Sequence, residues 1–189
     1  RAENEIDKIA VAHHLNDSIE TFFINTIRGT GLSGMKGISA LNGHIIRPLL
    51  FATREELEHF ARKKKLKWRE DSSNAGDDYL RNRIRHTVIP ELKTKNQEFE
   101  KSMQRSLDFF DFANHIQKTF IEDWKKKNTS VTPDGSVTIR LKPVMDFQFS
   151  AALLSAVLHP YGITNLEPGK ILNASPGKIF QSQSARILY

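Results

Sequence analysis

The sequence predicts an α/β fold for its first half and a mostly helical second part with a small β portion. Two short apolar segments, residues 6–12 and 44–47, have the composition of strands and alternate with helical patterns. A long helical pattern over residues 97–127 and a hairpin pattern then follow. We therefore expect two domains, residues 1–95 and residues 96–189.

The first predicted strand, residues 6–12, stands almost at the start of the sequence. A buried parallel strand needs a neighbour on each side, and the few residues before this one are too short to supply one. We therefore expect the chain to be part of a longer α/β domain whose earlier strands lie upstream.

A helix is predicted directly after this strand. Asp17 and Glu20 have the spacing of a capping box in which Asp17 is the N-cap residue. Apolar residues recur after them at helical spacing, and Gly29 stands where glycine often ends a helix. His13 and His14 are thus expected in a strand-to-helix turn, where ligands bind in open α/β sheets.

Three glycines, Gly29, Gly31 and Gly34, match the letters of the dinucleotide-binding pattern G-x-G-x-x-G. That pattern must follow a strand and open a helix, whereas these glycines follow a helix. We interpret the segment as a glycine-rich loop, and a mobile loop that covers a nucleotide is the alternative.

The second predicted strand, residues 44–47, is ended by Pro48. Thr53 and Glu56 then have capping-box spacing and begin an amphipathic helix over residues 54–65.

Polar residues over 66–78 predict a loop. Asp77 or Asp78 is expected to cap the next helix, residues 79–93, which Pro90 is expected to kink or end.

The second half carries four further patterns beyond its long helix. We expect a hairpin over residues 132–141 and an apolar, nearly all buried helix over residues 147–158. A short helix over residues 166–172 and a strand pair over residues 178–189 complete the chain.

The composition excludes several classes of site. Among the 189 residues there is no cysteine, which excludes disulfides, thiolate zinc sites, iron–sulfur clusters and catalytic thiols. No apolar run approaches the roughly 20 residues that cross a bilayer, and the charged residues 1–8 do not resemble a signal peptide. We expect a cytoplasmic protein without a membrane partner.

The net charge points to a polyanionic partner. The chain has 28 Lys and Arg against 22 Asp and Glu, a net charge of +6. The basic residues are densest in two runs: Arg62, Lys63, Lys64, Lys65, Lys67 and Arg69, then Arg81, Arg83 and Arg85. Trp68 and Tyr79 lie among them and favour a nucleic-acid surface, with a solvated charged face as the simpler alternative.

The first candidate site comprises His13, His14, Asp17 and Glu20. Adjacent histidines rarely share one metal, and no H-x-x-x-H pair exists, which disfavours a zinc enzyme. A purely structural interpretation has Asp17 and Glu20 only cap the helix. The functional interpretation is a nucleotide site in which His14 and the helix N-terminus face phosphates and a carboxylate helps to hold Mg²⁺.

The second candidate site lies in the polar loop and comprises Trp68, Glu70, Asp71, Ser73 and Asn74. Paired carboxylates in a basic neighbourhood suit a cationic amine or a metal. The alternative is a simple Asx-type turn.

The third candidate site comprises Arg81, Asn82 and Arg85. Arg81 and Arg85 are one helical turn apart and share a face. Two fixed guanidinium groups beside an amide suit a phosphate or a carboxylate, while ion pairs with Asp77 and Asp78 are the alternative.

These three sites, in this order, resemble the tRNA(Ile)-lysidine synthetase family, an N-type ATP pyrophosphatase (PP-loop) family. The resemblance is close over residues 8–95 and looser in the second part. It is carried by the segments AHHLNDSIETFFINTIRGTGLSGMKGI, IIRPLL, TREELEHFA, WREDSSN and YLRNRIRHTVIPELK.

The resemblance implies a Rossmann-like PP-loop ATPase domain followed by a tRNA-recognition domain. It also implies a ligase that uses ATP and Mg²⁺ to adenylate the C2 oxygen of the wobble cytidine in isoleucine tRNA with a CAU anticodon. The ε-amine of free L-lysine then attacks C2 and displaces AMP. We expect a homodimer as well, since an exposed sheet edge favours self-association.

The same resemblance assigns roles to residues. It implies that His14, Asp17, Glu20 and Thr21 lie beside the ATP site. We expect His14, Asp17 and Glu20 to be catalytic and Asp17 to be a magnesium ligand. It implies that Glu70, Asp71 and Asn74 bind lysine, and that Arg28, Arg81, Asn82 and Arg85 bind RNA or phosphate.

Two departures from the family pattern stand out. The family usually has Asp where this chain has Asn16, which puts a carboxylate role there in doubt. The glycine-rich S-G-G-x-D-S loop that grips ATP phosphates is not in this sequence. We expect it upstream, and we expect residues 1–189 alone not to adenylate RNA.

Two other interpretations remain open. One is another PP-loop tRNA-modifying ATPase, although thiolating relatives commonly use cysteines that this chain lacks. The other is a non-catalytic basic RNA-binding module, which steep salt dependence without nucleotide dependence would favour.

Overall fold

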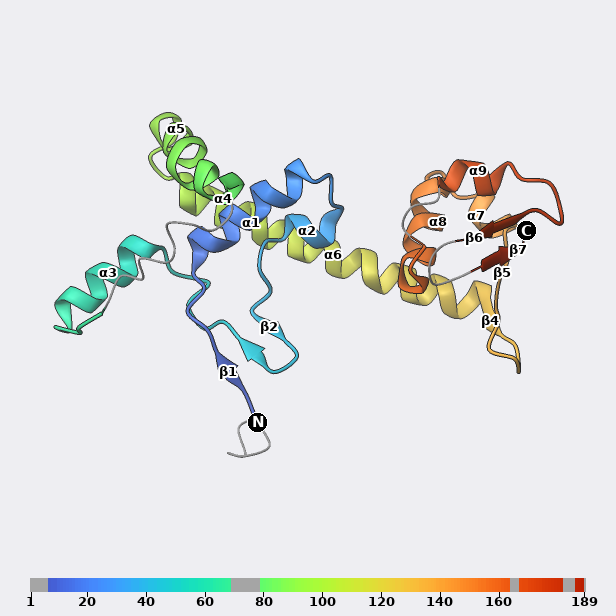
Figure 1. The fold of residues 1–189 in the computed structure, drawn as a ribbon, viewed down its shortest axis with the longest axis horizontal. Coiled ribbons are helices and arrows are strands. Elements are labelled where there is room, and N and C mark those ends of the chain that lie inside the picture. Colours follow the sequence, from blue (N-terminus) through green and yellow to red (C-terminus); the bar gives the residue numbers. More distant parts are fainter. Residues whose placement is uncertain (1–6, 69–78, 164–166, 182–185, 189) are drawn as a thin grey trace. The chain divides into compact units, whose positions relative to one another are not determined.

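The computed structural model describes residues 7–68, 79–163, 167–181 and 186–188 (Figure 1). By internal contacts the chain divides into unit 1, Arg1–His115, and unit 2, Ile116–Tyr189. The division falls inside the long helix α6 (Phe99–Asn128), because the first turns of α6 pack into the core of unit 1. The functional domain boundary between residues 95 and 96 stays a prediction.

Unit 1 contains a small mixed sheet in the order β1-β3-β2. Its strands are β1 (Ile9–Ala10), β2 (Leu41–Asn42) and β3 (Ile45–Ile46); β3 pairs with β1 in parallel and with β2 antiparallel. The strand predicted over residues 44–47 is confirmed, whereas the hairpin partner β2 was not predicted.

The expectation that the first strand is buried is wrong for this structure. Ile9 is 54% exposed, and within the described residues β1 has one neighbouring strand, β3. Within the described residues β1 is thus an edge strand of two residues, and the exposure of Ile9 means that this side chain is not packed in a core.

The helices of unit 1 follow the predicted order. They are α1 (Leu15–Ile27), α2 (Leu32–Met35), α3 (Arg54–Lys63), α4 (Tyr79–Arg83), the π-helical segment η2 (Ile84–Val88), α5 (Ile89–Lys95) and the first part of α6. The capping box of Thr53 and Glu56 is confirmed at the start of α3. The glycine-rich segment was expected as a loop, but it contains the single-turn helix α2.

The predicted cap of α1 is wrong. The N-cap residue is His14, and Asp17 occupies the third helical position, where its carboxylate accepts a hydrogen bond from the His14 N–H at 2.8 Å. The helix therefore begins three residues earlier than the capping box of Asp17 and Glu20 predicts, which leaves the Glu20 side chain available for a partner elsewhere.

Pro90 does not end its helix. The N–H of Ile89 donates to the carbonyl of Ile84, five residues back, so the turn before Pro90 is a π-helical turn. Such a turn is wider than an α-turn and accommodates a residue that has no N–H to donate. Helix α5 then continues to Lys95.

The core of unit 1 joins α1, η2, α5 and α6. Its buried residues are Leu15, Ile19, Ile24, Ile84, Ile89, Phe99 and Leu107. Because Ile19 and Ile84 are almost fully buried, α1 is held against the segment that carries the predicted arginines.

Unit 2 has a core of its own. It contains the end of α6, the hairpin β4 (Thr129–Val131) and β5 (Val137–Ile139), the helices α7 (Lys142–Met145), α8 (Ser150–Leu158) and α9 (Pro168–Leu172), the 3₁₀ turn η3 (His159–Tyr161), and the pair β6 (Ile179–Gln181) and β7 (Arg186–Leu188). Val144, Leu154 and Ile171 are among its buried residues. The predicted strand pair and short helix are confirmed. The hairpin predicted over residues 132–141 is correct in its turn and second strand, but its first strand, β4, lies before residue 132.

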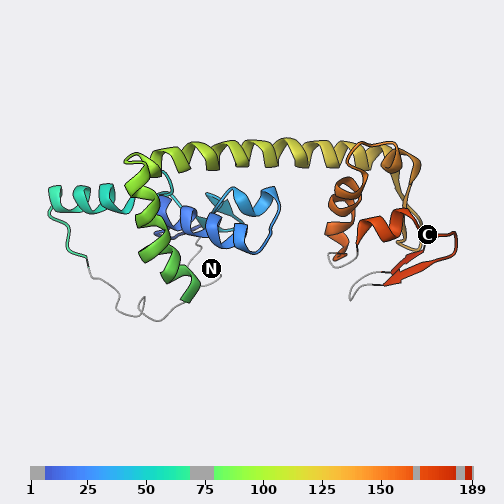
Figure 2. The ribbon, with the colours of Figure 1, turned by 90° about the horizontal axis from the view of Figure 1, so that it is seen from above.

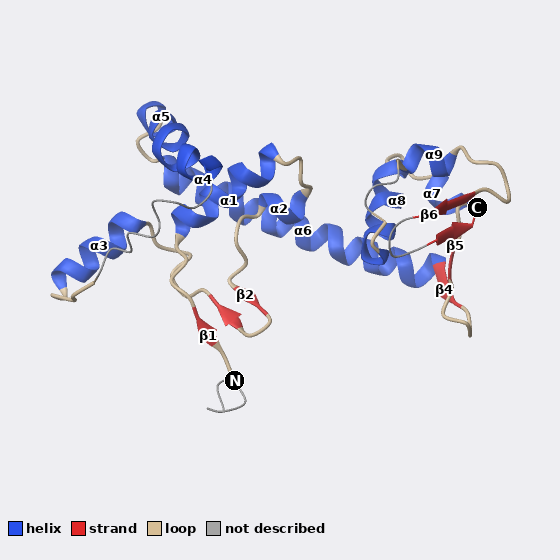
Figure 3. Cartoon of the chain, viewed as in Figure 1, coloured by secondary structure: helices blue, strands red, loops and turns tan. Residues whose placement is uncertain are grey.

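The predicted apolar helix is only partly correct. Helix α8 begins at Ser150 rather than at residue 147, and Phe149 is exposed. Figure 3 shows that helices dominate the described chain and that its strands form small sheets. No helix among the described residues is long and apolar enough to cross a membrane.

Candidate functional site

A cavity of about 340 Å³ lies in unit 1 where the start of α1 meets the segment from η2 to α5. The first residue of α3 also borders it. The lining residues are His14, Asn16, Asp17, Glu20, Arg54, Arg85, His86 and Ile89. Three of the predicted first-site residues and one arginine of the third site thus surround one space.

An ion pair between Glu20 and Arg85 holds the two sides of this cavity together. Arg85 donates from Nε to Glu20 Oε1 at 2.6 Å and from Nη2 to Oε2 at 2.8 Å. Glu20 is 2% exposed, and a charge so buried requires this kind of paired, hydrogen-bonded partner. The parallel geometry fixes the plane of the guanidinium group.

Arg81 and Asp17 extend the ion pair into a network. Arg81 Nε lies 3.6 Å from Glu20 Oε2, and Arg85 Nη2 lies 4.0 Å from Asp17 Oδ1. The predicted shared face of Arg81 and Arg85 is confirmed by their common contact with Glu20. Both oxygens of Glu20 are engaged, whereas Asp17 Oδ1 has only this long contact within the described parts of the chain.

The charge of Arg85 is secured by its surroundings. The hydrogen bonds to Glu20 raise the pKa of the Arg85 guanidinium above its ordinary value, and the charges of Glu20 and Asp17 add to this effect, while partial burial opposes it. Arg85 is therefore a cation at neutral pH, as arginine ordinarily is in proteins.

His14 is the N-cap residue of α1, and its ring nitrogen Nδ1 is buried. Its Nδ1 atom is buried without a hydrogen-bond partner among the described residues and lies 3.4 Å from Asp17 Oδ2. In the capping box that begins α1, the His14 side chain also faces the backbone N–H of Asp17. The neighbouring His13 is exposed and accepts a long hydrogen bond from Arg47 Nε at 3.4 Å.

Several predicted site residues are not brought to this cavity. Arg28 caps the far end of α1, and a helix of 13 residues separates it from His14 by roughly 20 Å. Asn82 is half-buried on α4 and does not line the cavity. Glu70, Asp71 and Asn74 lie outside the described residues.

Four lining residues were not predicted as site residues from the sequence: Asn16, Arg54, His86 and Ile89. Asn16 Oδ1 accepts a hydrogen bond from the N–H of Arg54 at 2.9 Å, which ties the start of α3 to the start of α1. His86 follows Arg85 directly. For Asn16 the one signal in the sequence was its expected departure from the pattern of the family that the chain resembles.

Metal binding by protein groups alone is not supported. Among the described residues no group of three or more His, Asp or Glu side chains could hold a metal ion. A magnesium ion at this site would need its remaining ligands from phosphate and water oxygens, which is how Mg²⁺ commonly binds beside one or two carboxylates.

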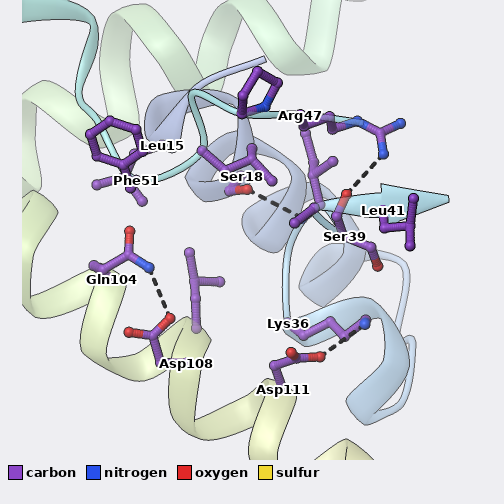
Figure 4. A pocket seen from close by; sticks show the side chains of 15 residues that line it. Leu15, Ser18, Lys36, Ser39, Leu41, Arg47, Phe51, Gln104, Asp108 and Asp111 are labelled. Atoms are coloured by element: carbon purple, nitrogen blue, oxygen red, sulfur yellow. Dashed lines mark hydrogen bonds and ion pairs between the residues drawn. The ribbon is translucent and has the colours of Figure 1, made fainter. Parts of the chain in front are cut away.

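A second, larger cavity of about 700 Å³ lies in unit 1 between α6 and the segment from Lys36 to Phe51. Figure 4 shows that polar groups lining this cavity are paired with one another: Lys36 with Asp111, Gln104 with Asp108, and Arg47 with the carbonyl of Ser39. The larger cavity thus differs from the cavity around Glu20, where one buried carboxylate pairs with two arginines.

The chain is similar to a known domain family and to several named enzymes. Residues 1–92 match the PP-loop domain. The tRNA(Ile)-lysidine synthase of Bacteroides thetaiotaomicron is 35% identical over 159 residues, which cover 84% of this chain and 36% of that protein. The enzymes of the same name from Porphyromonas gingivalis and Bacillus subtilis are 35% identical over 163 and 150 residues, or 86% and 74% of this chain.

The chain spans about a third of the length of the curated relatives it matches, between 32% and 36% for these three. Residues 1–92, which match the PP-loop domain, include every residue that lines the cavity around Glu20. Residues 1–92 therefore carry a PP-loop domain, and the chain is similar to relatives that are named tRNA(Ile)-lysidine synthase.

Proposed function

We propose that this chain carries part of the ligase site of a tRNA-modifying enzyme that joins lysine to C2 of the wobble cytidine in isoleucine tRNA with a CAU anticodon. The observation that carries the proposal is the buried Glu20 carboxylate holding Arg85 and Arg81 at the edge of a cavity that also contains Asp17. The PP-loop domain and the names of the relatives supply the reaction class.

The proposed reaction has two balanced steps. In the first, the cytidine C2 oxygen attacks the α-phosphorus of ATP and pyrophosphate leaves. In the second, the lysine ε-amine, after losing a proton, attacks C2, and the C2 oxygen departs with AMP. The site must therefore bind phosphates, offset their charge and hold an amine close to C2.

The arginines suit the phosphate role. Glu20 uses both oxygens on Arg85 and Arg81, so we propose that it positions these cations rather than acting as an acid or base. Arg81 is about half exposed and keeps donors that face away from Glu20. Fixed guanidinium groups lose little freedom when they bind a phosphate.

Asp17 suits the binding of a cation, either the lysine amine or Mg²⁺. Its Oδ2 accepts from the backbone of His14, while Oδ1 is available to a cationic amine or to a magnesium ion shared with phosphate oxygens. We propose this atom as the contact between the protein and the amine or Mg²⁺. His14 Nδ1 lies 3.4 Å from the other carboxylate oxygen, Asp17 Oδ2, and we propose that it belongs to the same cluster of polar groups.

Other predicted features remain part of the proposal. Lysine recognition by Glu70, Asp71 and Asn74, RNA contacts by Arg28 and Asn82, tRNA recognition by the second domain, cytoplasmic location and a homodimer all stay predictions.

The test uses the full-length natural protein that contains this chain. Purified protein, a CAU-anticodon isoleucine tRNA transcript, ATP, Mg²⁺ and labelled lysine should give a nucleoside with the mass of cytidine plus lysine minus water. Asp17→Asn should lower the rate by about a hundredfold, whereas Glu58→Gln, which removes an exposed carboxylate on α3, should not. Salt-sensitive tRNA binding without ATP-dependent lysine transfer would instead favour the RNA-binding module.

A further inference from the structure

The C-terminal end of α3 carries an unusual concentration of positive charge. We define the α3 tip as residues 62–68. It contains five cationic side chains, all exposed, and no acidic residue: Arg62, Lys63, Lys64, Lys65 and Lys67. Arg62 lies 3.8 Å from Glu58 Oε2, while none of the four lysines has an acidic partner among the described residues. Among the residues that the structure describes, the charge of the tip is therefore largely uncompensated.

The backbone at this end is held in a defined shape. The N–H of Leu66 donates to the carbonyl of Ala61 at 2.9 Å, and the N–H of Lys65 donates to the carbonyl of Arg62 at 3.1 Å. These bonds form a Schellman motif, whose turning residue is usually glycine. Here that residue is Lys65, with a φ of 53°.

A lysine in this left-handed conformation costs about 1 kcal/mol relative to glycine. The motif does not need the lysine side chain, because its hydrogen bonds are made by backbone groups alone. A cation at a position that favours glycine points to a use for that charge outside the fold.

Apolar surface accompanies the cations. Phe60 is 54% exposed and Trp68 is 50% exposed, and no residue of α3 is buried. Lys64 Nζ lies 6.0 Å from the centre of the Phe60 ring. Figures 1 and 2 show α3 extending away from α1 and α5 of the same unit, so its tip is accessible.

We infer that the α3 tip binds a single-stranded segment of RNA, with its lysines on phosphates and with Phe60 and Trp68 stacked against unpaired bases. Cations flanked by exposed aromatic rings, as here between Phe60 and Trp68, are the combination that such binding uses. A duplex hides its base faces from aromatic side chains, and an acidic peptide would engage the lysines but leave the rings without flat partners. The inference rests on the proposed function only for the identity of the RNA as a tRNA.

The first experiment measures binding of the full-length protein to a short unstructured RNA by fluorescence anisotropy over a range of salt concentrations. Replacing Lys63, Lys64 and Lys67 with Gln should weaken binding at least about tenfold. The slope of log affinity against log salt concentration should become shallower by about 0.7 for each phosphate that the variant no longer neutralises.

The control for this experiment replaces Lys93, Lys95 and Lys101 with Gln. These lysines are paired with glutamates, so the same change in net charge should leave RNA binding nearly unchanged. Equal effects of the two triple variants would overturn the inference.

Lys65→Gly separates binding from stability. The variant should melt at a higher temperature than the natural protein because the strained residue is gone, yet it should bind the RNA several-fold more weakly. A variant that gains stability cannot have weakened RNA binding through unfolding. If Lys65→Gly binds as tightly as the natural protein, the cation has no role in RNA binding and the inference fails.

Two aromatic variants test the stacking contacts. Phe60→Leu and Trp68→Leu should each lower RNA affinity about tenfold without altering the salt dependence. Polyglutamate or anionic vesicles of phosphatidylserine that compete as well as RNA would contradict the assignment to RNA.

The same set of proteins distinguishes this inference from the proposed function. If the natural protein transfers lysine and the tip variants bind RNA normally, the inference fails while the proposed function stands. If the natural protein binds RNA through the tip but transfers no lysine, the proposed function fails and the inference stands.

Discussion

Arg85 donates two parallel hydrogen bonds, at 2.6 and 2.8 Å, to the carboxylate of Glu20, which lies 65 residues earlier in the chain and is almost fully buried. The pair joins α1 to η2 across the candidate site. Because a planar guanidinium and a planar carboxylate are held in one plane, the orientation of both groups is restricted.

Replacing Glu20 with Gln is expected to destabilise the protein by about 2 kcal/mol. Breaking a buried ion pair typically costs about 3–5 kcal/mol, and we reduce this value because Arg85 is partly exposed and its charge is screened by water. Urea denaturation followed by circular dichroism measures the change. The control is Glu91→Gln, which removes an exposed pair with Lys95 at 3.8 Å and should cost less than about 0.5 kcal/mol. Similar losses in both variants would contradict a special role for the Glu20 pair.

Replacing Arg85 with Lys keeps the charge but removes the paired hydrogen bonds. An ammonium group cannot donate to both carboxylate oxygens in one plane, so we expect kcat/KM for lysine transfer to fall at least about tenfold. The matched control is Arg83→Lys on the exposed surface of α4, which should retain the natural rate. An Arg85→Lys enzyme with full activity would show that the fixed plane of the guanidinium is not needed.

The N-terminus of α3 should lose stability in acid. Hydrogen bonds from the Thr53 backbone and hydroxyl lower the pKa of Glu56 below its ordinary value. A carboxyl group whose folded-state pKa is depressed stabilises the fold fully above its unfolded-state pKa, roughly 4.3 for glutamate, and this contribution disappears as the pH falls through the lowered value. Hydrogen exchange at the first turn of α3 should therefore accelerate in this acidic window.

The variant Glu56→Gln should show a flatter pH dependence at the same amides. Thr53→Ala should destabilise the helix by about 1 kcal/mol at neutral pH through loss of the cap. An unchanged acid response in Glu56→Gln would mean that another carboxyl group governs this turn.

Replacing Gly37 with Ala is expected to cost about 2–3 kcal/mol. Its φ is +73°, and an added Cβ would lie 3.1 Å from Ser18 Cβ and 3.3 Å from Leu107 Cδ2, so conformational strain and overpacking combine. Gly43 also has a positive φ, +59°, but an added Cβ there meets nothing within 4 Å. Gly43→Ala should thus cost only about 1 kcal/mol. Equal losses of unfolding free energy in the two variants, measured by urea denaturation, would show that Ser18 and Leu107 move aside to accommodate the added methyl group.

Much of the local structure could be predicted because it depends on neighbouring residues. The capping box of Thr53 and Glu56, the end of α1 before Gly29 and the turn of the hairpin β4–β5 each arise from side chains and backbone within a few residues. The shared face of Arg81 and Arg85 follows from helical spacing in the same way. Periodicity and turn chemistry encode such features directly.

The errors at α1 have a different origin. Asp17 and Glu20 satisfy the capping-box spacing, yet His14 caps the helix and Glu20 turns inward to Arg85. The local pattern competes with a partner far along the chain, and a buried carboxylate with two hydrogen bonds from a guanidinium outweighs a solvent-exposed cap.

The sequence by itself determined the family resemblance, the order of most elements and the residue types of the site, since these depend on short motifs and on helical or strand spacing. Only the tertiary structure decided that Glu20 pairs with Arg85, that Asn16 holds the start of α3, and that Asn82 and Arg28 stand apart from the cavity. The physical reason is that each of these outcomes depends on which surfaces are buried together when α1 packs against η2. Burial of that kind is a property of contacts between distant segments, and no spacing within either segment encodes it.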